Sequence, residues 1–206
     1  MGCGVVMGGK LLTVPIYKAA GFSLCSGTAL HLTAPNDLTN ASWQKSNVTV
    51  TVNNQTDPFG VINNAGSVTC NNAGGGAFSV SIAQTVGILT ANTTYEISGY
   101  FKSTVAPVWM RVSIGDSGNA FDGWAAWVNC STAAMGTTSS GSGPIGGTFD
   151  CGKAQLLGTG WVQFTLAGHY TSNSSGSTSF FAQLSDTGST SNPTLNQAFN
   201  YYTLGP

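Results

Sequence analysis

The side chains best suited to chemistry lie in and just after residues 94–116, where apolar and polar residues alternate. Five of them carry an aromatic ring or a guanidinium group: Tyr100, Trp109, Arg111, Trp124 and Trp127. Aromatic rings stack on sugar rings and polar groups fix the hydroxyls, which is the chemistry of a carbohydrate site. Protein interfaces favour the same residue types, and aromatic residues also fill cores. We therefore favour a protein interface or the core, over a sugar-binding site, as the place of these five residues.

The acidic residues offer little catalytic chemistry. A glycosidase needs two carboxylates about 5–9.5 Å apart across a cleft. Glu96 and Asp116 would approach each other if residues 94–116 form a hairpin, but a turn aspartate and an isolated strand glutamate are the more ordinary interpretation. Neither His31 nor His169 lies in a nucleophile elbow. We therefore predict no catalytic residue, and a glycoside-active enzyme that uses Glu96 is the least favoured alternative.

A metal site finds only weak support in the sequence. Asp116, Asn119 and Asp122 could supply oxygen ligands to calcium, but their spacing is not that of an EF-hand loop. The five cysteines show no metal-type spacing. Cys130 and Cys151 flank a Gly/Ser-rich stretch and could close it as a disulfide, while free thiols in a reducing cytoplasm are the favoured alternative. We expect no metal and no other cofactor.

The elements that must position these residues are predicted to be strands. In residues 94–103 and 108–116, alternation with a period of two indicates half-buried strands. A short joint that ends at Pro107 favours a hairpin. Its register would place Phe101 opposite Met110 on the inner face and Tyr100 opposite Arg111 on the outer face. Trp109 would then lie on the same outer surface.

About eight short strands are predicted along the chain, with no amphipathic helix. They cover residues 48–52, 61–70, 78–83, 94–102, 108–114, 124–129, 161–166 and 179–185. Residues 132–148 are rich in Gly, Ser and Thr, which favours a surface excursion without a core of its own. This pattern predicts an all-β fold of two packed antiparallel sheets, a sandwich or jelly roll.

Composition limits the classes of function. Only 6% of the 206 residues are charged, against about a quarter in an average globular protein. The net charge of -1 provides no basic field for nucleic acid or an anionic membrane, and no stretch reaches the ~20 apolar residues of a membrane span. A surface with so few charges is typical of a protein that is packed in an assembly, although a neutral, hydroxyl-rich surface that stays soluble is an equal alternative.

The first 35 residues differ from the rest of the chain. They show no sustained period, yet several of their side chains are too apolar for a free tail: Leu11, Leu12, Val14, Ile16 and Tyr17. We interpret residues 1–35 as an extended arm that docks on the flank of the domain or on a neighbouring subunit. A first strand of the same domain is an equal alternative. Residues 36–206 are then the sandwich domain.

Several motifs follow one another in a recognisable order. They are NDLTNASWQKSNVTV (36–50), DPFG (57–60), QTV (84–86), TYEISGYFK (94–102), GTGW (158–161) and FAQL (181–184). Together they resemble the jelly-roll, carbohydrate-binding-module-like domains of bacteriophage structural proteins, over about residues 36–190. Residues 131–150 and the segment before Asn36 depart from that pattern, so the resemblance does not give the site of attachment.

The resemblance implies a jelly-roll fold and a place in a phage virion, with synthesis in the host cytoplasm. We expect a non-enzymatic structural protein, either capsid-decorating or tail-associated, that contacts other copies of itself and other virion proteins. The alternative is a carbohydrate- or receptor-binding module on the virion surface, with a host surface glycan as ligand. Neither nucleic acid nor a membrane is an expected partner.

Overall fold

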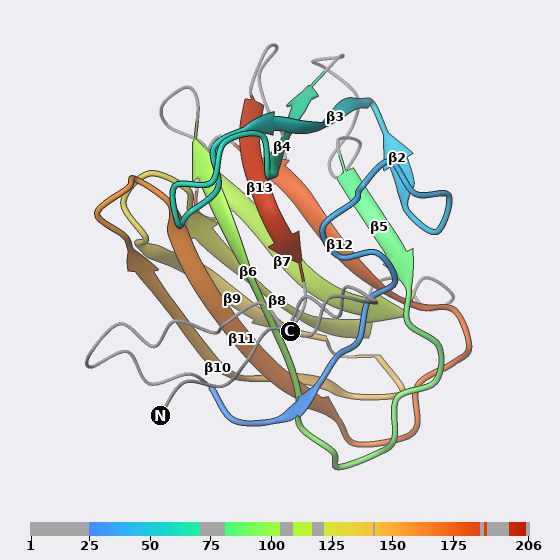
Figure 1. Cartoon of the computed structure of the whole chain (residues 1–206). Coiled ribbons are helices and arrows are strands. Elements are labelled where there is room, and N and C mark those ends of the chain that lie inside the picture. Colours follow the sequence, from blue (N-terminus) through green and yellow to red (C-terminus); the bar gives the residue numbers. More distant parts are fainter. Residues whose placement is uncertain are drawn as a thin grey trace, which may run out of the picture.

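The computed structural model describes residues 25–70, 81–103, 109–116, 122–141, 143–185, 188 and 198–204, with Tyr201 the one described side chain in the last range. These residues form strands, turns and bends, and no helix occurs among them (Figure 1). The strands are β1 (Thr28–Ala29), β2 (Gln44–Ser46), β3 (Val48–Gln55), β4 (Ala65–Cys70), β5 (Ser81–Thr85), β6 (Tyr95–Ser103), β7 (Trp109–Asp116), β8 (Asp122–Asn129), β9 (Met135–Ser140), β10 (Gly147–Leu156), β11 (Val162–Tyr170), β12 (Thr178–Ser185) and β13 (Ala198–Leu204).

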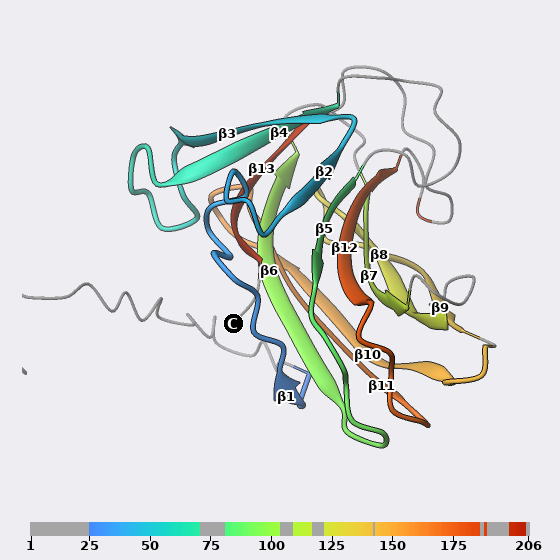
Figure 2. The same cartoon turned by 90° about the vertical axis from the view of Figure 1, so that its right-hand side faces the viewer.

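Two sheets face each other. Sheet I has the order β10-β11-β6-β13-β4-β3, with the short β1 paired to the free part of β6. Sheet II has the order β2-β5-β12-β7-β8-β9. Figure 2 shows the layers nearly edge-on, with β6 and β13 on one side and β5 and β12 on the other. All strand pairs are antiparallel except β1 with β6.

The connectivity is that of a jelly roll. Four pairs of strands are nested: β7 pairs with β8, β6 with β11, β5 with β12, and β4 with β13. Consecutive pairs lie alternately in sheet II and sheet I, so a long antiparallel ribbon is rolled into two layers. This confirms the predicted all-β, antiparallel two-sheet fold.

The predicted hairpin of residues 94–116 is wrong. β6 lies in sheet I between β11 and β13, whereas β7 lies in sheet II between β12 and β8. Phe101 is opposite Val162 and stacks on Phe164, with ring centroids 4.7 Å apart, and does not face Met110. Alternation identifies a half-buried strand but not its partner, and a jelly roll places these two consecutive strands in opposite layers.

The core fills the space between the sheets. Alternate residues of the central strands point inward, so Phe101, Phe164, Val112, Trp124 and Phe180 are fully buried in one cluster. Close packing extends to the backbone, because a Cβ atom at position 168 would lie 2.5 Å from the Trp124 ring. Burying an aromatic or branched side chain contributes about 1.5–3 kcal/mol, so this shared interior is the main source of stability.

Both lateral corners of the sandwich are closed by the chain. Between β2 and β3, Asn47 takes a positive φ of 53°, which asparagine tolerates, and the chain turns from sheet II to sheet I. On the other side, β9 pairs with β8 in sheet II, and β10 continues in sheet I. The prediction of a surface excursion at residues 132–148 is therefore wrong for most of that stretch, because its backbone hydrogen bonds join both sheets.

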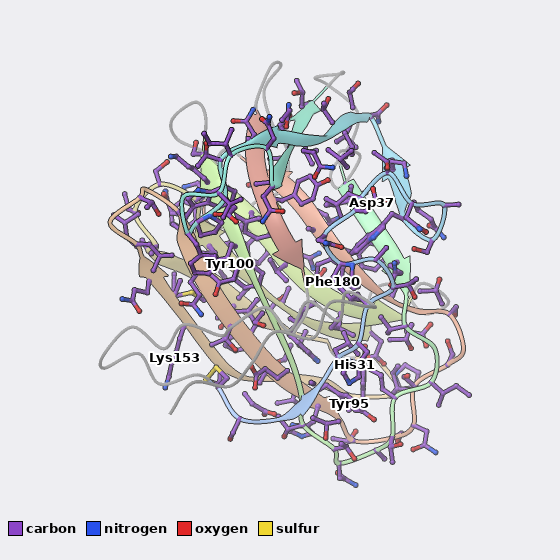
Figure 3. All side chains as sticks on the ribbon, viewed as in Figure 1. His31, Asp37, Tyr95, Tyr100, Lys153 and Phe180 are labelled. Carbon is purple, nitrogen blue, oxygen red and sulfur yellow. A yellow bond between two sulfur atoms is a disulfide. The ribbon has the colours of Figure 1, made fainter. Side chains whose placement is uncertain are left out.

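Part of the predicted arm lies on the sandwich. Cys25 forms a disulfide with Cys151 on β10, seen as the yellow bond beside Lys153 in Figure 3. Leu30 and Leu32 join the core cluster, and β1 pairs with β6. The alternative disulfide between Cys130 and Cys151 does not form, since Cys130 is a buried free thiol whose pKa is raised by burial. The predicted arm residues Leu11, Leu12, Val14, Ile16 and Tyr17 lie outside the described residues.

Candidate binding pocket

The predicted aromatic and guanidinium residues do not form one site. Tyr100 lies on β6, and its side chain is on the outer face of sheet I, away from the core between the two sheets. Trp109, Arg111 and Trp127 lie together on the outer face of sheet II, where Arg111 is directly opposite Trp127. Trp124 points the other way and is fully buried in the core. Arg111 and Trp127 therefore contact each other, Trp109 lies on the same face, and Tyr100 and Trp124 lie elsewhere.

The outer face of sheet II holds a closed group of side chains, the Arg111 cluster, made of Arg111, Ser113, Trp127 and Gln183. The Arg111 Nη1 atom donates to Gln183 Oε1 at 2.5 Å and to Ser113 Oγ at 3.0 Å. The guanidinium carbon lies 5.2 Å from the centroid of the Trp127 ring, in a cation–π contact. The strand register explains this grouping, because Gln183, Arg111 and Trp127 are direct neighbours on β12, β7 and β8.

The Arg111 cluster is occupied by its own members. Arg111 is 3% exposed and Trp127 6% exposed. Burial lowers the pKa of Arg111 to about 10, so the side chain remains a cation at neutral pH. Because the guanidinium group already contacts the Trp127 ring and two hydrogen-bond acceptors, a sugar could reach neither group without displacing the other.

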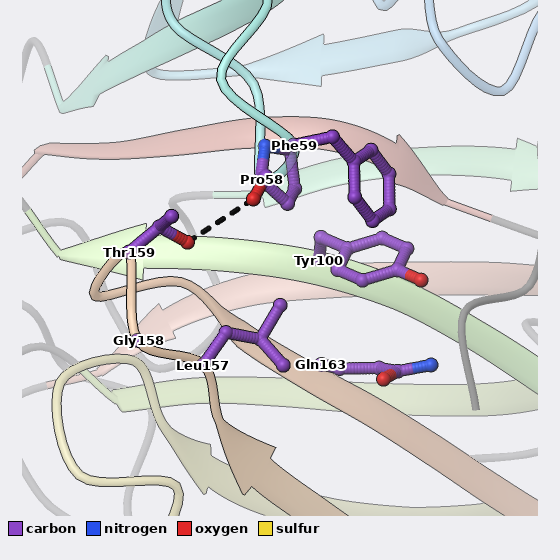
Figure 4. Close-up of a pocket in the computed structure, with 7 residues that line it drawn as sticks. All are labelled: Pro58, Phe59, Tyr100, Leu157, Gly158, Thr159 and Gln163. Carbon is purple, nitrogen blue, oxygen red and sulfur yellow. Dashed lines mark hydrogen bonds between the residues drawn. The ribbon is translucent and has the colours of Figure 1, made fainter. Parts of the chain in front are cut away.

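An open pocket lies on the opposite outer face, that of sheet I. It has a volume of about 270 Å³. Its lining combines the loop between β3 and β4, the turn between β10 and β11, and the outer faces of β6 and β11 (Figure 4). The residues are Pro58, Phe59, Tyr100, Leu157, Gly158, Thr159 and Gln163.

Asp57 shapes the loop that forms one wall of this pocket. Its buried carboxylate accepts hydrogen bonds from the backbone N–H groups of Phe59 and Val61 at 2.8 and 2.9 Å, and from Asn64 Nδ2 at 2.7 Å. Aspartate favours such turns because it bonds the backbone two residues ahead. The Asp-Pro-Phe-Gly motif therefore forms a turn, and the turn holds the Phe59 ring edge-on to Tyr100, with centroids 5.8 Å apart.

The floor of the pocket is a second, small apolar cluster outside the main core. Ala65, Tyr100 and Trp161 are buried together, and Leu157 packs against them. The turn that carries Leu157 is tied to the opposite wall by the Thr159 hydroxyl, which donates to the Pro58 carbonyl at 3.2 Å. Two segments far apart in sequence are therefore fixed to one another across the pocket.

Polar groups occur in a single row beside the apolar wall. Tyr100 is opposite Gln163, and Gln163 is opposite Gln155, on the neighbouring strands β6, β11 and β10. In Figure 4 the Tyr100 hydroxyl and the Gln163 amide point to the same side. Within the described part of the chain, the buried Oε1 atom of Gln155 has no hydrogen-bond partner. Of this row, Tyr100 and Gln163 line the pocket, so the Gln163 amide is the one that a ligand in the pocket could reach.

The weak calcium candidates serve the fold. Asp122 is fully buried and accepts the backbone N–H groups of Ile145, Gly146 and Gly147 at 2.7–3.3 Å. Asp116 accepts the N–H of Ser175 at 2.9 Å. Donors that point at a carboxylate occupy the positions that a cation would take. Asn119 lies outside the described residues, and within those residues no group of three His, Cys, Asp or Glu side chains could hold a metal ion.

The groups considered for catalysis are not arranged for it. Glu96 and Asp116 belong to different sheets, so the approach expected from a hairpin does not occur. Glu96 accepts a hydrogen bond from the Thr165 hydroxyl; burial raises its pKa, and this bond opposes the shift. His169 pairs with Asp150 at 2.8 Å on the outer face of sheet I. This arrangement provides no pair of carboxylates facing across a cleft.

Sequence reasoning missed Phe59 and Gln163 as pocket residues. From the sequence, Phe59 belongs only to the DPFG motif, and Gln163 only to the strand predicted at residues 161–166. The signal was the register between strands distant in sequence, which pairs Gln163 with both Tyr100 and Gln155.

No protein-family model matches the chain, and a search of curated proteins found no match. Among the residues that the structure describes, no helix has the length and hydropathy to cross a membrane.

Proposed function

We propose that this chain is a non-enzymatic structural protein of a bacteriophage virion, either capsid-decorating or tail-associated. In this role it contacts other copies of itself and other virion proteins through the surface of the sandwich and the N-terminal arm. The resemblance over about residues 36–190 supports the virion context. The jelly-roll topology agrees with that resemblance.

One observation carries the proposal: three large apolar side chains are exposed together in the β3–β4 loop. Val61 and Ile62 are 54% and 74% exposed, and Phe59, in the same loop, is 37% exposed. Contiguous exposed apolar residues commonly mark protein contacts. The carboxylates of Asp57, Asp116 and Asp122 are engaged in holding turns, which supports a structural rather than a catalytic role.

Substitutions in the β3–β4 loop test the proposal. The double variant Val61→Asp, Ile62→Asp should reduce incorporation into particles and shift the purified chain toward smaller species. Ile88→Asp is the matched control, since Ile88 is 67% exposed in a different loop. The readouts are quantitative mass spectrometry of purified particles and sedimentation velocity. Normal incorporation of the double variant, with an unchanged sedimentation profile, would contradict the proposed contact.

The arm is tested by deletion of residues 1–24. This deletion leaves Cys25, Leu30 and Leu32 in place, so the disulfide and the core contacts of the domain are kept. We expect a folded protein that no longer enters particles. A truncated chain that occupies particles at the normal level would show that the arm has no role in assembly.

A second candidate function is a carbohydrate- or receptor-binding module on the virion surface. The pocket on sheet I favours it, because the exposed ring of Phe59 and the amide of Gln163 both line it. The β3–β4 loop serves both candidate functions, because it carries the exposed Val61 and Ile62 and also supplies Phe59 to the pocket.

A further inference from the structure

We propose that the pocket lined by Phe59, Tyr100 and Gln163 binds a neutral sugar ring. The inference rests on the second candidate function and gives it a site and a ligand class. The pocket volume of about 270 Å³ lies just below the range usual for drug-sized ligands, which suits a single ring rather than a longer oligosaccharide.

The apolar wall of the pocket fits the C–H face of a sugar. Phe59 presents an exposed ring that is fixed on one side by its edge-on contact with Tyr100. Pro58 and Leu157 extend the apolar surface. Because Asp57 holds the loop through three hydrogen bonds, the ring is in place before a ligand arrives, and little ordering is needed on binding.

The amide of Gln163 fits the hydroxyl groups of a sugar. Gln163 lines the pocket, and the structure shows no hydrogen bond from its amide to any other described residue. An amide both donates and accepts, so a sugar hydroxyl in the pocket could bond to Gln163 in either direction.

The absence of charge among the lining residues favours a neutral sugar over an acidic one. Of the described residues that line the pocket, none is ionised at neutral pH. The cation nearest along β6 is Lys102, whose Nζ atom donates to the Thr159 carbonyl at 2.9 Å and so braces the turn. A carboxylate or sulfate on the ligand would therefore find no dedicated counter-ion.

The experiment measures binding of methyl glycosides of glucose, galactose, mannose and N-acetylglucosamine to the full chain. Saturation-transfer NMR detects contact, and titration gives the affinity, expected near a Kd of about 1 mM because few groups are engaged. Phe59→Ala and Gln163→Leu should each weaken binding by about tenfold or more. Gln44→Leu is the control, since it makes the same chemical change at an exposed position of β2.

The outcomes separate this inference from the virion proposal. Binding of at least one glycoside, lost in both pocket variants and kept in Gln44→Leu, supports the site. Failure of all four glycosides to bind would overturn it, as would binding that survives both pocket substitutions. Phe59 is partly exposed, so its variant is expected to fold, and thermal unfolding checks this. None of these results depends on incorporation into particles.

Discussion

The outer faces of the two sheets carry similar types of residue, which form a closed cluster on sheet II and border an open pocket on sheet I. On sheet II, Arg111 contacts Gln183, Ser113 and Trp127, and the group is closed. On sheet I, Phe59, Tyr100 and Gln163 border a pocket, and the neighbouring Gln155 has an unpaired oxygen. Both groups combine aromatic rings with hydrogen-bonding side chains. The comparison teaches that residue type does not separate a structural cluster from a candidate binding pocket, whereas the open space beside the side chains does.

Position in the sheet explains the difference. Arg111 lies on a central strand, so β12 and β8 supply partners on both sides through the regular register. The pocket lies where the strands of sheet I meet a loop and a turn, and Phe59 comes from that loop. Side chains on paired strands have neighbours that the register fixes. A loop that packs beside a sheet leaves space between the loop and the sheet.

The largest expected effect comes from the covalent link on sheet I. Cys25→Ser removes a disulfide between residues 126 positions apart, and we expect a loss of about 4 kcal/mol in the free energy of unfolding. Urea denaturation measures it. Cys151→Ser should give the same loss, and the double variant should be no worse than either. A larger loss in the free energy of unfolding for the double variant than for either single variant would show that the two cysteines do not stabilise the fold through one shared disulfide.

The next effect tests the closed cluster. Arg111→Ala removes charge-assisted hydrogen bonds and a cation–π contact, and we expect a loss of about 2–3 kcal/mol in the free energy of unfolding. Gln163→Ala in the pocket should cost less than about 1 kcal/mol, as expected where no hydrogen bond is lost. Urea denaturation measures both variants. Equal losses in the free energy of unfolding for Arg111→Ala and Gln163→Ala would contradict the contrast between the two outer faces.

A smaller effect is expected in the loop that carries Phe59. Asp57→Asn weakens the bonds to the backbone N–H groups of Phe59 and Val61, and should lower the free energy of unfolding by about 1–2 kcal/mol. The sugar affinity should fall as well, since the ring is then less well held. Asp37→Asn is the control, because Asp37 makes a similar turn bond to Thr39 at an exposed site far from the pocket lining.

The smallest effect concerns pH on the outer face of sheet I. Burial raises the pKa of Glu96 above its ordinary value of 4.5. A raised folded-state pKa means that the contribution of Glu96 to stability is fully present below about pH 4.5 and is lost as the pH rises through the folded value. The stability of Glu96→Gln relative to the original chain should therefore increase between pH 3 and pH 7. Urea denaturation measures the difference in the free energy of unfolding between the variant and the original chain. A difference that stays constant from pH 3 to pH 7 would refute the raised pKa of Glu96.

The sequence predicts the strands better than their partners. Alternation correctly placed Phe101 and Met110 on inner faces, and it correctly gave two packed sheets. It could not show that Phe101 stacks on Phe164, because every half-buried strand has the same period. The pairing of β9 was hidden for another reason: its Gly, Ser and Thr side chains carry no apolar pattern, and backbone hydrogen bonds make the ladder.

The site was only partly accessible to sequence reasoning. Arg111 and Trp127 were both candidates for an interface, the core or a sugar site, and the structure shows that they contact each other. The pocket depends on the register that brings Gln155, Gln163 and Tyr100 into one row, which no local pattern contains. The partner of Cys151 was equally hidden, since disulfide connectivity does not follow from spacing.

The most direct test of the contrast between the two faces follows two side-chain amides by NMR. A methyl glycoside that binds is titrated into the full chain, and the side-chain NH₂ resonances of Gln163 and Gln183 are recorded together. We predict that the Gln163 resonances shift with saturation while those of Gln183, bonded to Arg111, stay fixed. Shifts at Gln183 with none at Gln163 would contradict the account.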